Sequence, residues 1–142
     1  MATLKDFRDE RLRKLSQLKL LGINPYPADS LRDHNAKQII EDFDKLEGKR
    51  VVIAGRILSI RKFGKLAFIV IRDFSGQIQL FIKSGQISDL DAPNGILGLG
   101  QLPLLDTGDF VEAEGEVIKT QTGEISVNVS KLRLLTKALR PI

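Results

Sequence analysis

The chain of 142 residues contains no cysteine and a single histidine. Without cysteine it forms no disulfide, thiolate zinc site or cysteine nucleophile, which fits the reducing cytoplasm. His34 alone does not supply a convincing serine–histidine–acid triad. Long apolar runs are also missing: the longest covers residues 66–71, so we expect neither a signal peptide nor a membrane span. We therefore predict that the chain by itself binds a partner, holds no cofactor and catalyses no reaction.

The basic residues are unevenly distributed along the chain. Although the net charge is only +4, residues 49–72 contain no acidic side chain and seven basic ones: Lys49, Arg50, Arg56, Arg61, Lys62, Lys65 and Arg72. Such a stripe suits a polyanion. An edge strand protected by charge against aggregation explains it equally well.

Two helices are expected in a helical segment, residues 1–47. Apolar residues recur at steps of three and four over residues 4–21, which predicts an amphipathic helix that ends at Gly22. A shorter helix should begin after Asn35, because Gln38 completes a capping box there. Its expected buried side consists of Ile39, Ile40, Phe43 and Leu46.

From residue 48 onward the pattern changes to strands. We predict strands near 50–62, 66–73, 77–82, 109–119 and 124–134, with a long connection over residues 83–108. Five strands with a longer connection after the third are typical of a five-stranded Greek-key OB-fold barrel, here residues 48–142. Another five-stranded topology fits the pattern too. In the connection, the apolar, glycine-rich segment 92–106 receives no role.

Strict alternation separates two sets of side chains on the second and third strands. It places Ala67, Ile69 and Ile71 inward and Phe68 outward. Gln79 then shares the outer face of the neighbouring strand. Arg61 closes the first strand beside them, and Glu124, Ser126 and Asn128 are expected outside on the last strand. An aromatic ring, an amide, a guanidinium and a carboxylate can together stack one base and read its edge.

Three acidic residues also share a face, at period two on the fourth strand. Glu112, Glu114 and Glu116 could bind a hard cation, but we expect a solvated face and no metal site.

Five stretches resemble the amino-terminal part of the bacterial-type class II lysyl-tRNA synthetases. They are RLRKLSQLKLLGINPYP (11–27), VIAGRI (52–57), FGKLAFIVIRDFSGQIQLFI (63–82), GDFVEAEGEVIKTQTGEISV (108–127) and LRLLTKALRPI (132–142). The resemblance implies an OB-fold anticodon-binding domain preceded by a helix. It also implies that Phe68 stacks on the central uridine of a lysine anticodon and that Gln79 reads its edge. Glu124 and Arg61 match further anticodon-contacting positions.

The same resemblance implies a larger parent enzyme. Such an enzyme is cytoplasmic and joins lysine to its tRNA with ATP and magnesium. It is a homodimer, and its catalytic domain is absent from this chain. Phosphates of lysine tRNA would contact Lys62, Lys65 and Arg72, whereas Gln121 replaces a lysine that is usual in the family's turn. Two other functions remain open: a dimerisation or interaction module built on the first helix and segment 92–106, and a sequence-indifferent single-strand binder.

Overall fold

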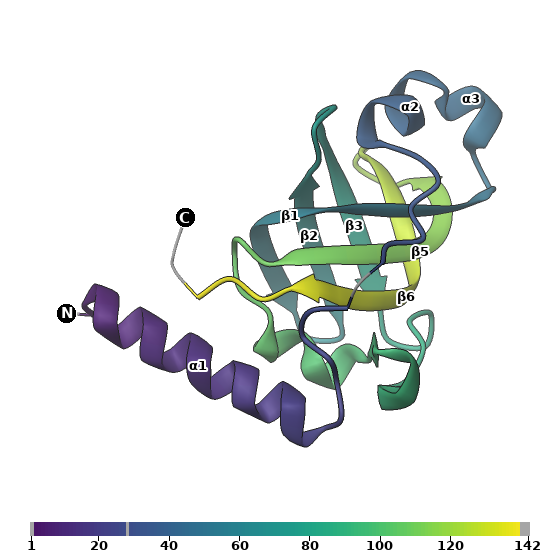
Figure 1. Ribbon diagram of the computed structural model, residues 1–142. Coiled ribbons are helices and arrows are strands. Elements are labelled where there is room, and N and C mark those ends of the chain that lie inside the picture. The colour runs from purple at the N-terminus through teal and green to yellow at the C-terminus, as the bar shows by residue number, and fades with distance from the viewer. Residues whose placement is uncertain (1, 28, 140–142) are drawn as a thin grey trace.

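The chain folds into a closed β-barrel with one long helix at its side (Figure 1). The computed structural model describes residues 2–27 and 29–139, so the end of the LRLLTKALRPI stretch lies outside the described residues. The strands are β1 (Arg50–Phe63), β2 (Leu66–Arg72), β3 (Gln77–Lys83), β4 (Ile96–Leu97), β5 (Phe110–Lys119) and β6 (Ile125–Thr136). Five of them were predicted from the sequence, and the two-residue β4 was missed.

The order of the strands around the barrel is that of an OB-fold. The sheet runs β3-β2-β1-β5-β6, and a parallel pairing of β3 with β6 closes it into a ring. Two glycines permit close strand contacts: a Cβ on Gly115 would lie 2.1 Å from the carbonyl oxygen of Asn128, and one on Gly55 would lie 2.6 Å from that of Arg72. Side chains at these positions would force the strands apart. The predicted OB-fold is confirmed.

The helices begin and end where their caps predict. Helix α1 (Leu4–Leu20) is followed by Gly22 at φ 84°, and the N–H of Ile23 donates to the carbonyl of Leu18, as in a Schellman motif. Helix α2 (Ala36–Glu41) starts with the expected capping box of Asn35 and Gln38, and the short α3 (Phe43–Leu46) follows. Ile40 is 44% exposed, so its predicted burial is wrong, whereas the neighbouring Ile39 is fully buried as predicted.

The long connection supplies part of the core. It contains the short helices η1 (Ala92–Asn94) and η2 (Leu99–Leu104), between which β4 pairs with β6. Leu97, Leu102 and Leu105 are buried in the same apolar cluster as Leu18 of α1. The connection therefore joins the helix to the barrel. Because these leucines are inside, they offer no surface for the dimer interface considered above.

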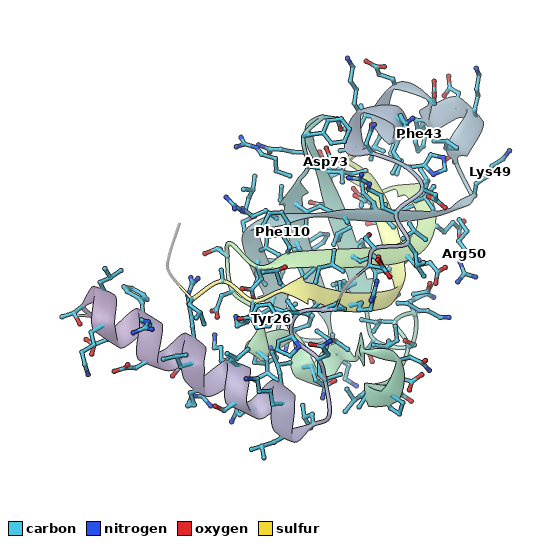
Figure 2. All side chains as sticks on the ribbon, in the orientation of Figure 1. Tyr26, Phe43, Lys49, Arg50, Asp73 and Phe110 are labelled. Atoms are coloured by element: carbon cyan, nitrogen blue, oxygen red, sulfur yellow. The ribbon has the colours of Figure 1, made fainter. Side chains whose placement is uncertain are left out.

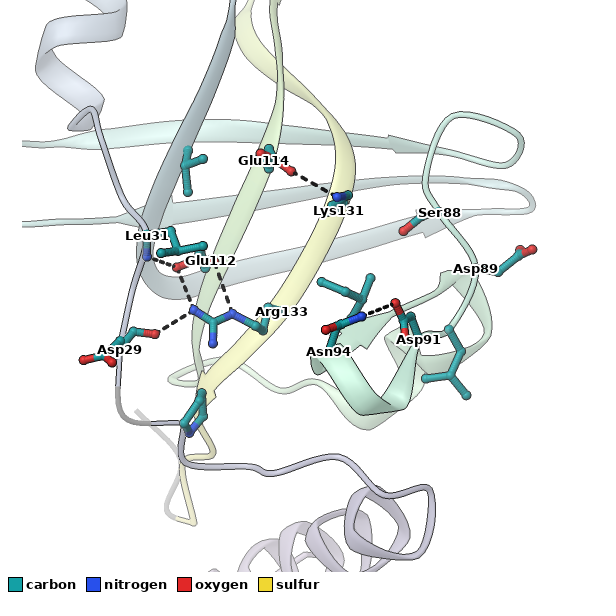
Figure 3. A pocket seen from close by; sticks show the side chains of 14 residues that line it. Asp29, Leu31, Ser88, Asp89, Asp91, Asn94, Glu112, Glu114, Lys131 and Arg133 are labelled. Carbon is teal, nitrogen blue, oxygen red and sulfur yellow. Dashed lines mark hydrogen bonds and ion pairs between the residues drawn. The ribbon is translucent and has the colours of Figure 1, made fainter.

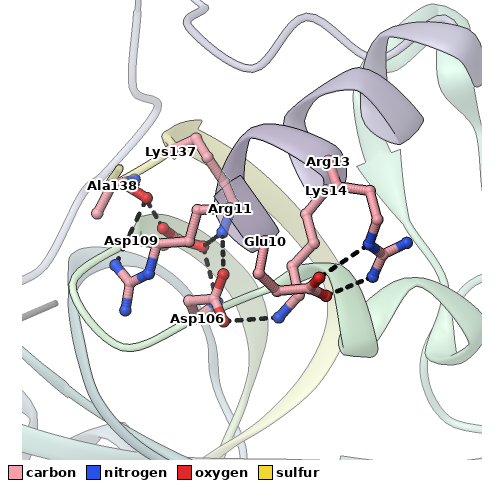
Figure 4. Close-up of polar contacts among 8 residues, drawn as sticks. All are labelled: Glu10, Arg11, Arg13, Lys14, Asp106, Asp109, Lys137 and Ala138. Atoms are coloured by element: carbon pink, nitrogen blue, oxygen red, sulfur yellow. Dashed lines mark hydrogen bonds and ion pairs between the residues drawn. The ribbon is translucent and has the colours of Figure 1, made fainter. Parts of the chain in front are cut away.

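A buried ionic cluster attaches α1 to the two segments beside it (Figure 4). The Nζ of Lys137 lies 2.7 Å from one oxygen each of Asp106 and Asp109, and both Lys137 and Asp109 are fully buried. From α1, Lys14 reaches the other oxygen of Asp106 at 2.7 Å, and Arg11 donates to the carbonyl of Ala138. Charged side chains thus link α1, the connection between β3 and β5, and the segment that follows β6.

The carboxylates of this cluster have opposite pKa shifts. Burial raises the pKa of Asp109, despite its hydrogen bonds with Lys137. Burial acts on Asp106 too, but hydrogen bonds from Lys137 and Lys14 outweigh it and lower the pKa of that carboxyl.

Candidate nucleic-acid interface

A row of side chains crosses the outer face of β1, β2 and β3. The strand register pairs Arg61 with Phe68, and Phe68 with Phe81. The Arg61 guanidinium lies over the Phe68 ring, 5.3 Å from its centroid, and the Phe81 ring meets that ring edge-on at 5.4 Å. Phe63 adds a second edge contact at 6.2 Å. Phe68 is half-buried among these neighbours, which fixes its orientation and leaves part of the ring exposed.

Gln79 lies in the next row, diagonally across from Phe68. It pairs with Val70 on one side and with Ser126 on the other, at the contact that closes the barrel. Its side chain is only 8% exposed, and its Nε2 donates to the Ser126 hydroxyl at 3.0 Å. Ser126, expected outside, is fully buried beneath this contact. This hydrogen bond fixes the orientation of the Gln79 amide before any partner binds.

The remaining predicted residues lie around this centre. Glu124 is exposed in the turn just before β6, two residues from Ser126. Arg72 shares the outer face with Phe68 at the far end of β2, about 13 Å away. Lys65 is in the β1–β2 turn. Lys62 pairs with Ala67, whose side chain points inward, so Lys62 lies on the other face of the hairpin from Phe68.

Three side chains of this face were not among the predicted site residues. Phe63 and Phe81 surround Phe68, and Ser126 holds Gln79. Phe81 is two residues from Gln79 on the same strand, so the alternation of side chains already predicts that it points outward. The sequence alone could therefore have identified Phe81 as part of this face. Contact between Ser126 and Gln79 requires the register of β3 against β6, which local pattern does not contain.

The acidic face of β5 differs from its prediction. Glu112 is buried, not solvated: its carboxylate accepts hydrogen bonds from Arg133 and the Leu31 N–H (Figure 3). The Ser30 hydroxyl also donates to it. These contacts attach the extended segment 29–31 to β5 and β6, at the side of a hollow of about 820 Å³. Glu114 pairs with Arg50 and Lys131. Only Glu116 has the predicted exposure.

Replacing Glu112 with glutamine should reduce stability in a pH-dependent way. Burial alone raises the pKa of Glu112, but hydrogen bonds from Arg133, Ser30 and Leu31 outweigh it and hold the pKa below its ordinary value. The charge therefore stabilises the fold above about pH 4.3, and this contribution is lost as the pH falls through the lowered pKa. We expect Glu112→Gln to cost about 1.5–3 kcal/mol at pH 7.

Urea unfolding at pH 7 and pH 3 measures this difference. The gap between wild type and Glu112→Gln should narrow at pH 3, whereas the exposed control Glu116→Gln should stay near wild type at both. A gap of the same size at both pH values would show that the charge of Glu112 contributes nothing.

The described residues give two further negative findings. None of their helices is long and apolar enough to cross a membrane. Residues 2–27 and 29–139 also hold no group of three or more histidine or acidic side chains able to bind a metal ion.

Fold and outer face together define a nucleic-acid-binding barrel. Residues 51–135 match the tRNA anti-codon family, described as an OB-fold nucleic acid binding domain, and the chain belongs to this family. Among curated proteins it is similar to lysine–tRNA ligases: 42% identical over 132 residues to that of Carboxydothermus hydrogenoformans, and 43% over 143 residues to that of Christiangramia forsetii.

These alignments cover nearly all of this chain but a small part of its relatives. They include 93% and 100% of this chain, against 26% and 25% of the two ligases. The ligase of Enterobacter sp. is 40% identical over 139 residues, which are 93% of this chain and 26% of the ligase. The chain thus spans about a quarter of the length of these relatives and corresponds to their N-terminal domain.

Proposed function

We propose that this domain recognises the anticodon loop of lysine tRNA on the outer face of β1, β2 and β3. The observation that carries the proposal is the row Arg61–Phe68–Phe81 beside the oriented amide of Gln79. A half-exposed aromatic ring next to an ordered hydrogen-bonding group is the arrangement with which proteins stack and read an unpaired base.

Each residue has a separate role in this proposal. Phe68 stacks on the central uridine and contributes affinity that is nearly independent of base identity. Gln79, Glu124 and Arg61 contact the polar edge of the base and discriminate, because a wrong base would leave their polar groups unpaired. Lys65 and Arg72 contact phosphates, each adding about −0.7 to the salt slope of binding, whereas Lys62 lies on the other face of the hairpin and is left out of this role.

The parent protein would be an ATP-dependent lysine–tRNA ligase. The similarity of this chain to the curated ligases supports this proposal. In such an enzyme ATP and magnesium act in the catalytic domain, where lysine is activated and transferred to the tRNA. This domain would hold the anticodon end of the same tRNA. We further propose that the parent is a cytoplasmic homodimer.

The variant Gln79→Ala tests the recognition role. We expect it to lose most of the preference for a central uridine over a central cytidine, because the amide that reads the base is gone. Fluorescence anisotropy with two labelled lysine anticodon stem-loops, identical except for that base, measures the preference. Gln77→Ala is the matched control, since Gln77 is an exposed glutamine on the same face of β3.

Two results would contradict this assignment. If Gln79→Ala keeps the wild-type preference, another group reads the base. If the wild-type domain binds unrelated poly-U and poly-A oligomers with equal affinity, the surface is a sequence-indifferent single-strand binder.

A further inference from the structure

Three arginines and two phenylalanines gather at the end of the barrel away from the β1–β2 turn. We call Arg32, Arg56, Arg72, Phe74 and Phe110 the arginine–phenylalanine patch. The strand register pairs Arg56 with Arg72 on one side and with Phe110 on the other. The close approach of β1 and β2 at Gly55, where a Cβ would lie 2.6 Å from the Arg72 carbonyl oxygen, brings these strands together. Figure 2 labels Phe110 on this part of the surface.

Both phenylalanine rings carry a guanidinium and remain accessible. Arg56 lies over Phe110 at 4.9 Å from the ring centroid, and Arg32 over Phe74 at 5.7 Å. Phe74 is 80% exposed and Phe110 37%. Phe74, Phe110 and Arg32 line one hollow of about 470 Å³. Two accessible aromatic rings thus lie beside one hollow.

The three arginines of the patch take part in none of the ion pairs that the described residues form. Within the described residues, no carboxylate lies within ion-pair distance of Arg32, Arg56 or Arg72. Glu112, two residues from Phe110 on β5, pairs instead with Arg133. The acid beside the patch, Asp73, accepts hydrogen bonds from the N–H groups of Ala36, Ser75 and Gly76 and from the Ser75 hydroxyl. Asp73, which lines the same hollow, is therefore already hydrogen-bonded by groups outside the patch.

We propose that the arginine–phenylalanine patch is a second RNA-contact site, which takes loop nucleotides next to the anticodon triplet. It rests on the function proposed above and extends it. Guanidiniums stacked on rings keep their N–H groups free for phosphate oxygens, and the exposed rings offer π-faces to unpaired bases. Arg72 joins this site to the first, because it shares the outer face of β2 with Phe68 about 13 Å away.

Binding of the lysine anticodon stem-loop to patch variants of the whole chain tests this site. We expect Phe74→Ala to weaken binding by at least about fivefold, the lower end of the contribution of one stacked base. Arg56→Gln and Arg32→Gln should each reduce the salt slope by about 0.7. A stem-loop with abasic nucleotides on either side of the triplet should bind wild type more weakly, and the difference between this loop and the intact one should be smaller for Phe74→Ala.

The controls use residues outside both surfaces. Leu20→Ala removes an apolar side chain that is 87% exposed at the end of α1, and Lys45→Gln removes an exposed positive charge on α3. Both should bind as wild type does. Thermal unfolding of every variant checks the fold, which Phe74→Ala should leave intact because that ring is exposed.

The outcomes separate this inference from the proposed function. If wild type prefers a central uridine and Phe68→Ala weakens binding, but the patch variants bind like wild type at every salt concentration, the second site is refuted and the first stands. If wild type shows no preference for uridine, the proposed function itself fails.

Discussion

Replacing Lys137 with methionine should lower the free energy of unfolding by about 3–5 kcal/mol, the usual cost of removing one partner of a buried ion pair. The ammonium of Lys137 lies 2.7 Å from Asp106 and from Asp109, and no part of its side chain reaches solvent. Without it, the carboxyl of Asp109 stays buried, and its remaining partners within the described residues are the N–H groups of Asp106 and Ala138. For a domain stabilised by about 5–15 kcal/mol, this is a large fraction.

The same substitution should loosen α1. Lys14 binds Asp106, and Arg11 donates to Ala138, so the helix depends on the groups that Lys137 holds in place. Urea unfolding gives the loss of stability, and hydrogen exchange of the α1 amides shows the loosening. The double variant Lys137→Met/Asp109→Asn also removes the unpaired carboxylate of Asp109. It should therefore be more stable than Lys137→Met alone. The control Lys131→Met removes a lysine that is 53% exposed and should cost less than about 1 kcal/mol. An equal loss in both methionine variants would show that the cluster contributes little.

Replacing Phe68 with alanine should weaken binding of the lysine anticodon stem-loop by about 1–3 kcal/mol. The ring is positioned by Arg61 above it and by Phe81 and Phe63 at its edges. Stacking depends little on which base is stacked, so loops with a central uridine or cytidine should be weakened alike. Fluorescence anisotropy with both loops measures the change.

Phe68→Leu distinguishes stacking from packing. Leucine keeps much of the apolar volume between Phe63 and Phe81 but has no π-face, so it should preserve the melting temperature better than alanine while binding almost as weakly. If Phe68→Leu binds the stem-loop like wild type, residue 68 contributes through apolar packing and not through stacking on a base. A loss of preference equal to that in Gln79→Ala would contradict the separate roles of the two residues.

Alternation along single strands was enough to predict which side chains point inward. Ala67, Ile69 and Ile71 are buried as expected, and Phe68 is not, because successive side chains of a strand point to opposite faces. Helix caps were equally local: the side chains of Asn35 and Gln38 and the backbone of Gly22 act within a few residues. The order of the strands, by contrast, came from the typical OB-fold chain order and the family resemblance, and not from pairing preferences.

What the sequence could not show is which outward side chains another segment covers. Gln79 and Glu112 both face outward by alternation, yet both are buried. Gln79 is covered where β3 meets β6, and Glu112 where segment 29–31 crosses β5. These contacts join residues far apart in the chain, and alternation contains no information about them. The same limit hid the cluster around Lys137, whose partners Asp106 and Asp109 are 31 and 28 residues away.

The most direct test of the account compares two stem-loops with the unmodified domain. One carries the lysine anticodon, and the other differs only in a cytidine at the central position; fluorescence anisotropy at one low salt concentration gives both affinities. We predict tighter binding of the uridine loop, because Gln79, Glu124 and Arg61 would leave polar groups unpaired against cytidine. Equal binding of the two loops would contradict the account and reduce this face to a stacking and electrostatic platform.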